Sequence, residues 1–139
     1  PDGQSNSIEL NGRSLSRRWV AVTERTVPGA VVAEVERFAG SVDALLLDGW
    51  SAAAPGGTGA RFPWQEIAGL REHVPASLRL IIAGGLSPDN VGDAVRLLSP
   101  DAVDVSSGVE ERPGVKSASA VPKFITAARR AALEPRTLS

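Results

Sequence analysis

The chain has 139 residues, of which 42% are hydrophobic and 22% are charged, and its formal net charge at pH 7 is −1. This length suits one domain with a real hydrophobic core, and the composition argues against a disordered chain. The near-zero net charge argues against a nucleic-acid partner, and the absence of a long apolar run argues against a membrane partner. Because there is no cysteine, disulfides and thiolate metal sites are excluded, and no metal site is predicted. We therefore expect a cytoplasmic protein.

Short apolar runs alternate with longer amphipathic stretches along the chain. Residues 1–7 are polar and are expected to be disordered or a linker, residues 8–10 form a candidate short strand, and residues 134–139 are expected to fray. Four short, mostly continuous apolar runs are typical of strands that are buried on both faces of a parallel sheet. These runs cover residues 19–22, 44–47, 78–83 and 102–105.

Hydrophobic residues recur at helical spacing between and after these runs, so we expect four helices. The clearest has Ser87 as its N-cap and Pro88 at its first helical position. The apolar stripe of this helix consists of Val91, Ala94, Val95 and Leu98. The stripes of the other three helices are, in chain order, Val31, Val32, Val35 and Phe38; Ile67, Leu70 and Val74; and Phe124, Ile125 and Ala128. Alternating strands and helices predict an α/β fold, either an open doubly wound sheet or part of a (β/α)8 barrel, since a complete barrel needs about 200–250 residues.

Asp48 directly follows the apolar run at residues 44–47. A carboxylate at the C-terminal end of a strand faces the mouth at which parallel α/β folds bind ligands. Partial burial there would suit this side chain to act as a general acid. An aspartate that caps a helix or fixes a loop has the same pattern, so position alone leaves both interpretations open.

Two loops that follow later strands are suited to bind an anion. Gly84 and Gly85 connect a strand to the helix that begins near Ser87, where free N–H groups favour a phosphate. Ser107 and Gly108 follow the next strand and offer N–H and hydroxyl groups at the neighbouring position. We expect the two loops to converge on one phosphate, because tight turns alone do not explain why these glycines follow strands rather than helices.

The remaining polar features have open roles. Residues 56–59 (Gly-Gly-Thr-Gly) can approach an anion or form a lid, but they lack the Lys-Ser/Thr ending of a Walker motif. Asp104 lies just inside the last predicted strand, where a structural hydrogen bond is an equal alternative to a place at the mouth. Lys116 either lies on the surface or steadies a loop. His73, the single histidine, is expected on the surface.

Taken in this order, the motifs resemble those of the phosphoribosylanthranilate isomerases, the (β/α)8-barrel enzymes of tryptophan biosynthesis. The resemblance runs from about Ile8 to the last helix, and it is carried by residues 45–48, 56–64, 83–91 and 104–114. It implies a partial (β/α)8 barrel over residues 8–133, roughly strands four to eight. It also implies an aldose–ketose isomerase that performs an Amadori rearrangement of a small phosphosugar, N-(5-phosphoribosyl)anthranilate, without a cofactor.

The resemblance also implies roles for individual residues. Asp48 matches the general acid that protonates the ribose ring oxygen, and Asp104 matches an acidic residue that helps to hold the anthranilate end. Gly57 and Gly59 belong to the flexible loop over the substrate. The backbone cradle for the phosphate matches Gly84, Gly85, Ser107 and Gly108.

The chain departs from the family pattern in the first half of the barrel. No segment matches strands one to three, and the cysteine general base of strand one has no counterpart. Asn11, Ala60 and Pro63 stand where the family usually has His, Lys and Asp. We therefore expect the C-terminal part of an isomerase that is inactive alone and needs the missing N-terminal barrel half. The alternative is a non-catalytic phosphosugar-binding partial barrel, in which a homodimer partner covers the open sheet edges.

Overall fold

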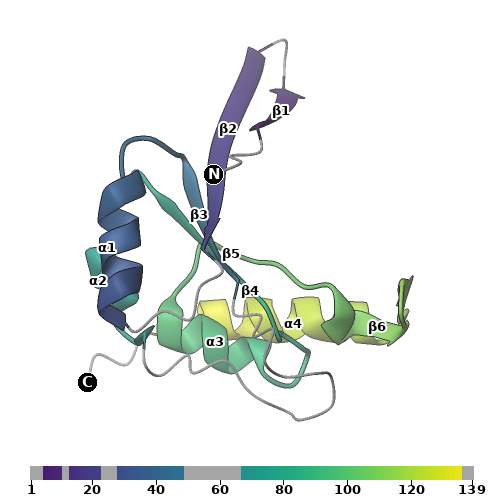
Figure 1. Cartoon of the computed structure of the whole chain (residues 1–139). Coiled ribbons are helices and arrows are strands. Elements are labelled where there is room, and N and C mark those ends of the chain that lie inside the picture. Colours follow the sequence, from purple (N-terminus) through teal and green to yellow (C-terminus); the bar gives the residue numbers. More distant parts are fainter. Residues whose placement is uncertain (1–4, 11–12, 23–27, 49–66, 136–139) are drawn as a thin grey trace.

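The computed structural model describes residues 5–10, 13–22, 28–48 and 67–135 (Figure 1). Within these residues one sheet has the strand order β1-β2-β3-β4-β5, and a second, smaller sheet pairs β6 with β7. The strands of the larger sheet are β1 (Ser5–Leu10), β2 (Arg13–Val22), β3 (Ala44–Asp48), β4 (Arg79–Ala83) and β5 (Ala102–Val103). The other elements are α1 (Pro28–Phe38), α2 (Leu70–His73), α3 (Val91–Leu98), the 3-10 helix η2 (Ser107–Val109), β6 (Glu110–Arg112), β7 (Val115–Lys116) and α4 (Ala120–Leu133).

Strands β2, β3, β4 and β5 pair in parallel, as the four apolar runs predicted. Helices separate them along the chain, which gives the expected βαβ order. The last strand is shorter than predicted: β5 ends at Val103, whereas the predicted strand continues to Val105. The N–H of Asp104 still donates to the Ile82 carbonyl at 2.9 Å, so the pairing with β4 continues to the start of the following loop.

The first strand is antiparallel, which differs from the all-parallel arrangement implied for residues 8–133. Leu10 pairs with Arg13, so two residues connect β1 to β2, whereas a parallel connection needs about a dozen or more. The connecting residues in the sequence are Asn-Gly, a strong hairpin signal. Ser5–Ser7 were expected to be disordered but belong to β1, since the hairpin gives them a partner strand. Figure 1 shows this hairpin projecting from the helices.

The hydrophobic core lies between the sheet and the helices. Leu45, Leu80 and Ile82 are fully buried, and the predicted inward stripe of α3 is buried as well. Each such side chain contributes about 1.5–3 kcal/mol of burial free energy. Helices α3 and α4 pack against each other, and α1 packs against α2 at the other end of the sheet (Figure 1). One contiguous core therefore runs from α1 to α4.

Three local expectations are corrected. Helix α3 begins at Val91 with Asn90 as its N-cap, because residues 87–90 form a tighter turn in which the Ser87 carbonyl accepts from the Asn90 N–H at 3.3 Å. Ile125 is 43% exposed rather than inward, because each helical step turns by about 100° and the inward face of α4 passes through Phe124. Glu134, expected to fray, pairs with Arg96 at 2.6 Å. None of the helices in the described part of the chain is long and apolar enough to cross a membrane.

Candidate functional site

Asp48 and Asp104 lie on the same face of the sheet. Leu45 and Leu47 of β3 point into the core, so by strand alternation Asp48 points to the opposite, more open face. Asp48 aligns with Ala83 of β4, and Ile81 aligns with Ala102 of β5. Continuing the same alternation places Asp104 on the face of Asp48. Both carboxylates are thus at the carboxyl ends of strands that flank β4.

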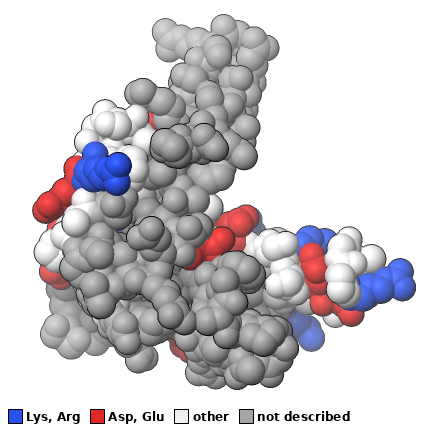
Figure 2. Space-filling view, in the orientation of Figure 1, with Lys and Arg blue, Asp and Glu red and all other residues white. Residues whose placement is uncertain are grey.

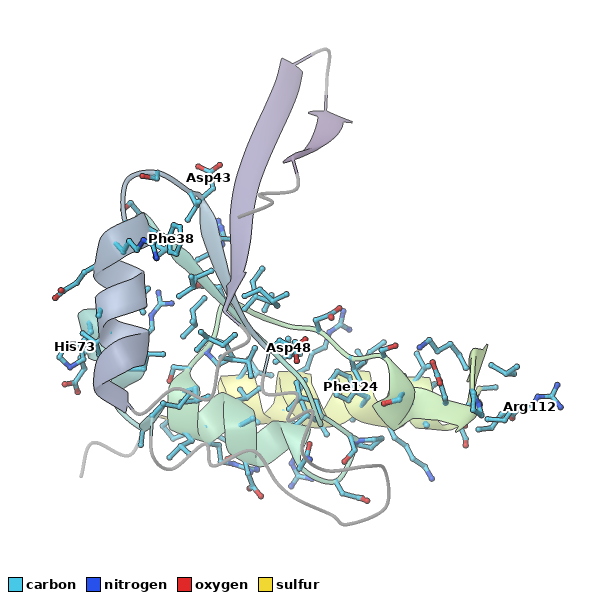
Figure 3. The ribbon with its side chains drawn as sticks, viewed as in Figure 1. Phe38, Asp43, Asp48, His73, Arg112 and Phe124 are labelled. Carbon is cyan, nitrogen blue, oxygen red and sulfur yellow. The ribbon has the colours of Figure 1, made fainter. Side chains whose placement is uncertain are left out.

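Two strand spacings separate these aspartates, which corresponds to about 10 Å between their Cα atoms. Asp48 is half-buried and Asp104 is exposed. Figure 3 shows Asp48 near the centre of the molecule, whereas His73 lies at the outer side with α2, as predicted. Figure 2 shows acidic side chains in the middle of the same view and at both of its sides, where the basic side chains also lie.

The loop after β4 has the geometry expected of a glycine-dependent turn. Gly84 and Gly85 have φ angles of +84° and +65°, in the left-handed region that favours glycine. The Asn90 side chain holds this loop from both sides: its Nδ2 donates to the Gly85 carbonyl at 2.8 Å, and its Oδ1 accepts from the Ser87 N–H at 2.8 Å. The amide side chain thus fixes the direction of two peptide groups beside the predicted phosphate.

The loop after β5 touches the loop after β4. An ideal Cβ atom on Gly108 would overlap the Leu86 carbonyl oxygen and lie 2.9 Å from its carbon. Any larger residue at position 108 would therefore push the two loops apart. Ser107 is exposed beside this contact. The two loops are therefore in contact, and their common binding of a phosphate stays a prediction.

Lys116 steadies the second loop, which was one of the two roles left open for it. Its Nζ donates to the Ser106 carbonyl at 2.9 Å and to Glu110 Oε1 at 2.9 Å. The other oxygen of Glu110 accepts from the Gly114 N–H at 3.2 Å. The Lys116 ammonium and then the Gly114 N–H hold the pKa of the Glu110 carboxyl below its usual range. The β6–β7 hairpin therefore places the Lys116 ammonium group against the loop that precedes β6.

A different polar cluster occupies the opposite edge of the sheet. Asp101 Oδ2 accepts from Arg71 Nη1 at 2.6 Å and from the Leu80 N–H at 2.8 Å. Burial acts to raise the pKa of Asp101, but the hydrogen bonds from Leu80 and Arg71 outweigh it, so this pKa is lowered overall. The cluster joins the start of β5 to the start of β4, away from the ligand-binding edge. In parallel α/β folds, this amino-terminal edge serves stability.

A groove of ≈ 680 Å³ runs between α3 and α4 on the outer side of the helices. Arg96 lies in it and forms ion pairs with Asp93 at 3.0 Å and with Glu134 at 2.6 Å. Neither aspartate of the strand ends lines this groove. Within the part of the chain that the structure describes, no group of three acidic or histidine residues is placed to hold a metal ion.

Comparison with known proteins identifies the family. The family model described as N-(5'phosphoribosyl)anthranilate (PRA) isomerase matches residues 9–127. The chain belongs to this family. An N-(5'-phosphoribosyl)anthranilate isomerase from Erythrobacter litoralis is 43% identical over 113 residues, which are 81% of this chain and 51% of that protein. The enzyme of that name from Pelobacter propionicus is 46% identical over 126 residues, which are 88% of this chain and 58% of that protein.

Solved phosphoribosylanthranilate isomerases share the fold. The Thermotoga maritima structure has a TM-score of 0.59 and 33% identity, and the match covers 81% of this chain and 50% of that one. The Pyrococcus furiosus structure has a TM-score of 0.56 and 25% identity, and the match covers 81% and 49%. The chain thus spans about half the length of the isomerases that it matches. The predicted α/β partial (β/α)8 barrel is confirmed.

The structure describes most of the predicted site residues, and their roles stay predictions. Gly108 lies against Leu86, so the loop of Ser107 and Gly108 meets the loop that follows Gly84 and Gly85, and Asp48 and Asp104 share one face of the sheet. Gly57 and Gly59, with Phe62 and Trp64, lie outside the described residues. Asn90 was noted only as part of a motif, and Lys116 was given no firm role. The sequence signal for the role of Asn90 is its spacing: a polar side chain three positions after Ser87 can accept a hydrogen bond from the Ser87 N–H.

Proposed function

We propose that this chain supplies the carboxyl-terminal half of a phosphoribosylanthranilate isomerase site. Asp48 acts as the general acid, Asp104 helps to hold the anthranilate end, and the backbone of Gly84, Gly85, Ser107 and Gly108 binds the phosphate. The observation that carries this proposal is that Asp48 lies at the carboxyl edge of the sheet beside two loops in direct contact. In the same proposal, Gly57 and Gly59 belong to a loop that covers the substrate.

The proposed reaction consists of proton transfers and needs no cofactor. Asp48 gives a proton to the ribose ring oxygen, the C1–O bond breaks, and the anthranilate nitrogen becomes part of a Schiff base. A general base then removes the proton from C2, and the resulting enolamine becomes the aminoketose when C1 gains a proton and the hydroxyl on C2 loses its proton. The base of the family is a cysteine, and this chain contains none. We therefore propose that the second step requires the N-terminal βα units and that the chain is inactive alone.

A phosphosugar ligand is consistent with the two loops and with a ligand that is bound to a related isomerase. One solved phosphoribosyl anthranilate isomerase, which is 30% identical to this chain, is in complex with reduced 1-(o-carboxyphenylamino)-1-deoxyribulose 5-phosphate. The continuous core from Val35 to Ala131 supports one domain over residues 8–133, to which Ser5–Ser7 are added by β1. As a step of tryptophan biosynthesis, the reaction belongs in the cytoplasm.

The experiment that tests this function restores the missing half. We would co-express the chain with the N-terminal βα units of the Erythrobacter litoralis relative and follow consumption of N-(5'-phosphoribosyl)anthranilate. The chain alone should give no turnover, and the complemented barrel should be active. Asp48→Asn should lower kcat by about 10²–10⁴-fold. Asp43→Asn is the matched control, because Asp43 lies at the opposite end of the same strand (Figure 3).

Two outcomes would contradict the proposal. Turnover by the unassisted chain that disappears in Asp48→Asn would show that no second half is needed. Turnover of the complemented barrel that is equally strong in Asp48→Asn and Asp43→Asn would show that Asp48 is not the acid.

A second candidate function is a non-catalytic phosphosugar-binding homodimer. It is favoured by the position of β5, which ends the strand order and pairs with β4 alone among the described strands. An edge of this kind is a site for pairing with another chain. One related structure is described as monomers generated from a dimeric isomerase. Sedimentation as a dimer, with phosphosugar binding and no turnover after complementation, would favour this candidate over the isomerase.

A further inference from the structure

The Ser106 carbonyl is held by a side chain ten residues further along the chain. Lys116 Nζ donates to it at 2.9 Å, and the Val109 N–H lies 3.4 Å from the same oxygen. The β6–β7 hairpin makes this possible, because Glu110 pairs with Lys116 in its register. Ser117 N–H also donates to the Val109 carbonyl at 2.8 Å, which ties the hairpin to the loop.

The direction of the Ser106 carbonyl determines the direction of the next N–H. The carbonyl of Ser106 and the N–H of Ser107 belong to one planar trans peptide unit, so they point in opposite directions. While Lys116 holds the carbonyl on the hairpin side, the Ser107 N–H points away from the hairpin. If the carbonyl were released, rotation of this peptide would turn the N–H as well. Among the described residues, no backbone carbonyl is recorded as accepting from the Ser107 N–H.

Lys116 is poorly suited to bind the phosphate by its own charge. Glu110 lies 2.9 Å from its ammonium group, so the two side chains form a neutral pair. A second ammonium donor is occupied by the Ser106 carbonyl. The geometry therefore favours an indirect effect on the anion over a direct ionic contact.

We propose that Lys116 is a positioning residue of the phosphate site, which acts by holding the Ser106 carbonyl so that the Ser107 N–H is directed at the anion. This inference rests on the proposed function, since it assigns a task to a residue beside the proposed cradle. Asn90 holds the Gly85 carbonyl of the other loop in a comparable way.

The test is a titration of the full chain with inorganic phosphate, followed by amide NMR. In the wild type, millimolar phosphate should shift the Ser107 amide proton downfield as it becomes a hydrogen-bond donor to the anion. Lys116→Met keeps the aliphatic stem and removes the donor, so phosphate binding should weaken about tenfold and the Ser107 shift should be lost. Lys116→Arg, which can still donate to both acceptors, should restore the shift. Lys123→Met is the matched control, since this exposed lysine of α4 carries the same charge.

The outcomes separate the two proposals. A wild-type chain whose Ser107 and Gly85 amides do not respond to phosphate would overturn the phosphate site, and the positioning role with it. A normal wild-type response that persists in Lys116→Met would overturn the positioning role alone. Equal weakening by Lys116→Met and Lys123→Met would mean a general charge effect and would likewise overturn it. Unchanged amide shifts for Leu80 and Ile82 in all variants would show that the core is intact.

Discussion

Gly108 lies against Leu86, so closely that a Cβ atom at position 108 would overlap the Leu86 carbonyl oxygen. This contact joins the loops that follow β4 and β5, and it explains a glycine at a position where the backbone needs no left-handed conformation. The requirement is steric and comes from another loop.

Gly108→Ala should therefore destabilise the chain and separate the two loops. We expect a loss of about 1–3 kcal/mol in the free energy of unfolding, because the methyl group meets backbone that cannot rotate away. Gly92→Ala is the matched control: its Cβ would meet only the end of the flexible Arg96 side chain, at 3.2 Å. Since Gly92 lies inside α3, alanine there should stabilise by about 0.5–1 kcal/mol. Urea unfolding measures both, and equal effects would contradict the steric explanation.

Asn90→Ala should loosen the loop after β4. The substitution removes the hydrogen bonds to Gly85 and Ser87, which together are worth about 1–3 kcal/mol in the free energy of unfolding. Asn90→Asp separates them, because a carboxylate still accepts from the Ser87 N–H but cannot donate to the Gly85 carbonyl. Its cost in urea unfolding should fall between those of the wild type and Asn90→Ala. An aspartate variant as unstable as the alanine variant would mean that the Gly85 bond carries the whole effect.

The sequence predicts the parallel part of this fold well for a physical reason. Runs such as residues 44–47 and 80–83 are apolar on both faces, and such runs are stable only inside a covered sheet. The hairpin of β1 and β2 was not predicted as antiparallel, although the Asn-Gly pair between them signals it. The family resemblance implies a parallel strand there, whereas a connection of only two residues requires an antiparallel one.

The candidate site could be predicted where it depends on strand ends and glycines, as for Asp48 and Gly108. It could not be predicted where a side chain reaches a distant backbone group. The contact of Lys116 with Ser106 depends on the β6–β7 hairpin, whose strands are only three and two residues long and give no periodic signal. The exposure of Ile125 was missed for a similar reason, since one residue of rotation decides which of two adjacent apolar side chains points inward.

Asp104→Asn should affect substrate binding more than the chemical step. In the barrel completed with N-terminal units, we expect KM to rise about tenfold, because a charge-assisted hydrogen bond to the anthranilate end is weakened, while kcat changes less. Steady-state kinetics beside Asp48→Asn measure this difference. A loss of kcat as large as that of Asp48→Asn would assign Asp104 a direct part in proton transfer.

Asp101→Asn should destabilise the chain at neutral pH and much less in acid. The pKa of Asp101 is lowered from 3.8 in the folded chain, so its ionised form adds stability that is fully present above the unfolded value. That stability is lost as the pH falls through the lower folded pKa. Both side chains of the Arg71–Asp101 pair are only about one-quarter exposed, at 26% and 25%. We therefore expect the neutral-pH cost of Asp101→Asn to be about 1–3 kcal/mol.

The acid dependence separates this cluster from an ordinary surface ion pair. Asp93 also pairs with an arginine, Arg96, but its side chain is 78% exposed. Asp93→Asn should therefore cost about 0–1 kcal/mol. Urea unfolding of the three proteins at neutral and acidic pH should show the gap between wild type and Asp101→Asn closing as the pH falls. If the difference in unfolding free energy between the wild type and Asp101→Asn stays constant in acid, the hydrogen bonds from Leu80 and Arg71 do not depend on the charge of Asp101. The asparagine variant would then be less stable only because its amide has the wrong hydrogen-bonding geometry.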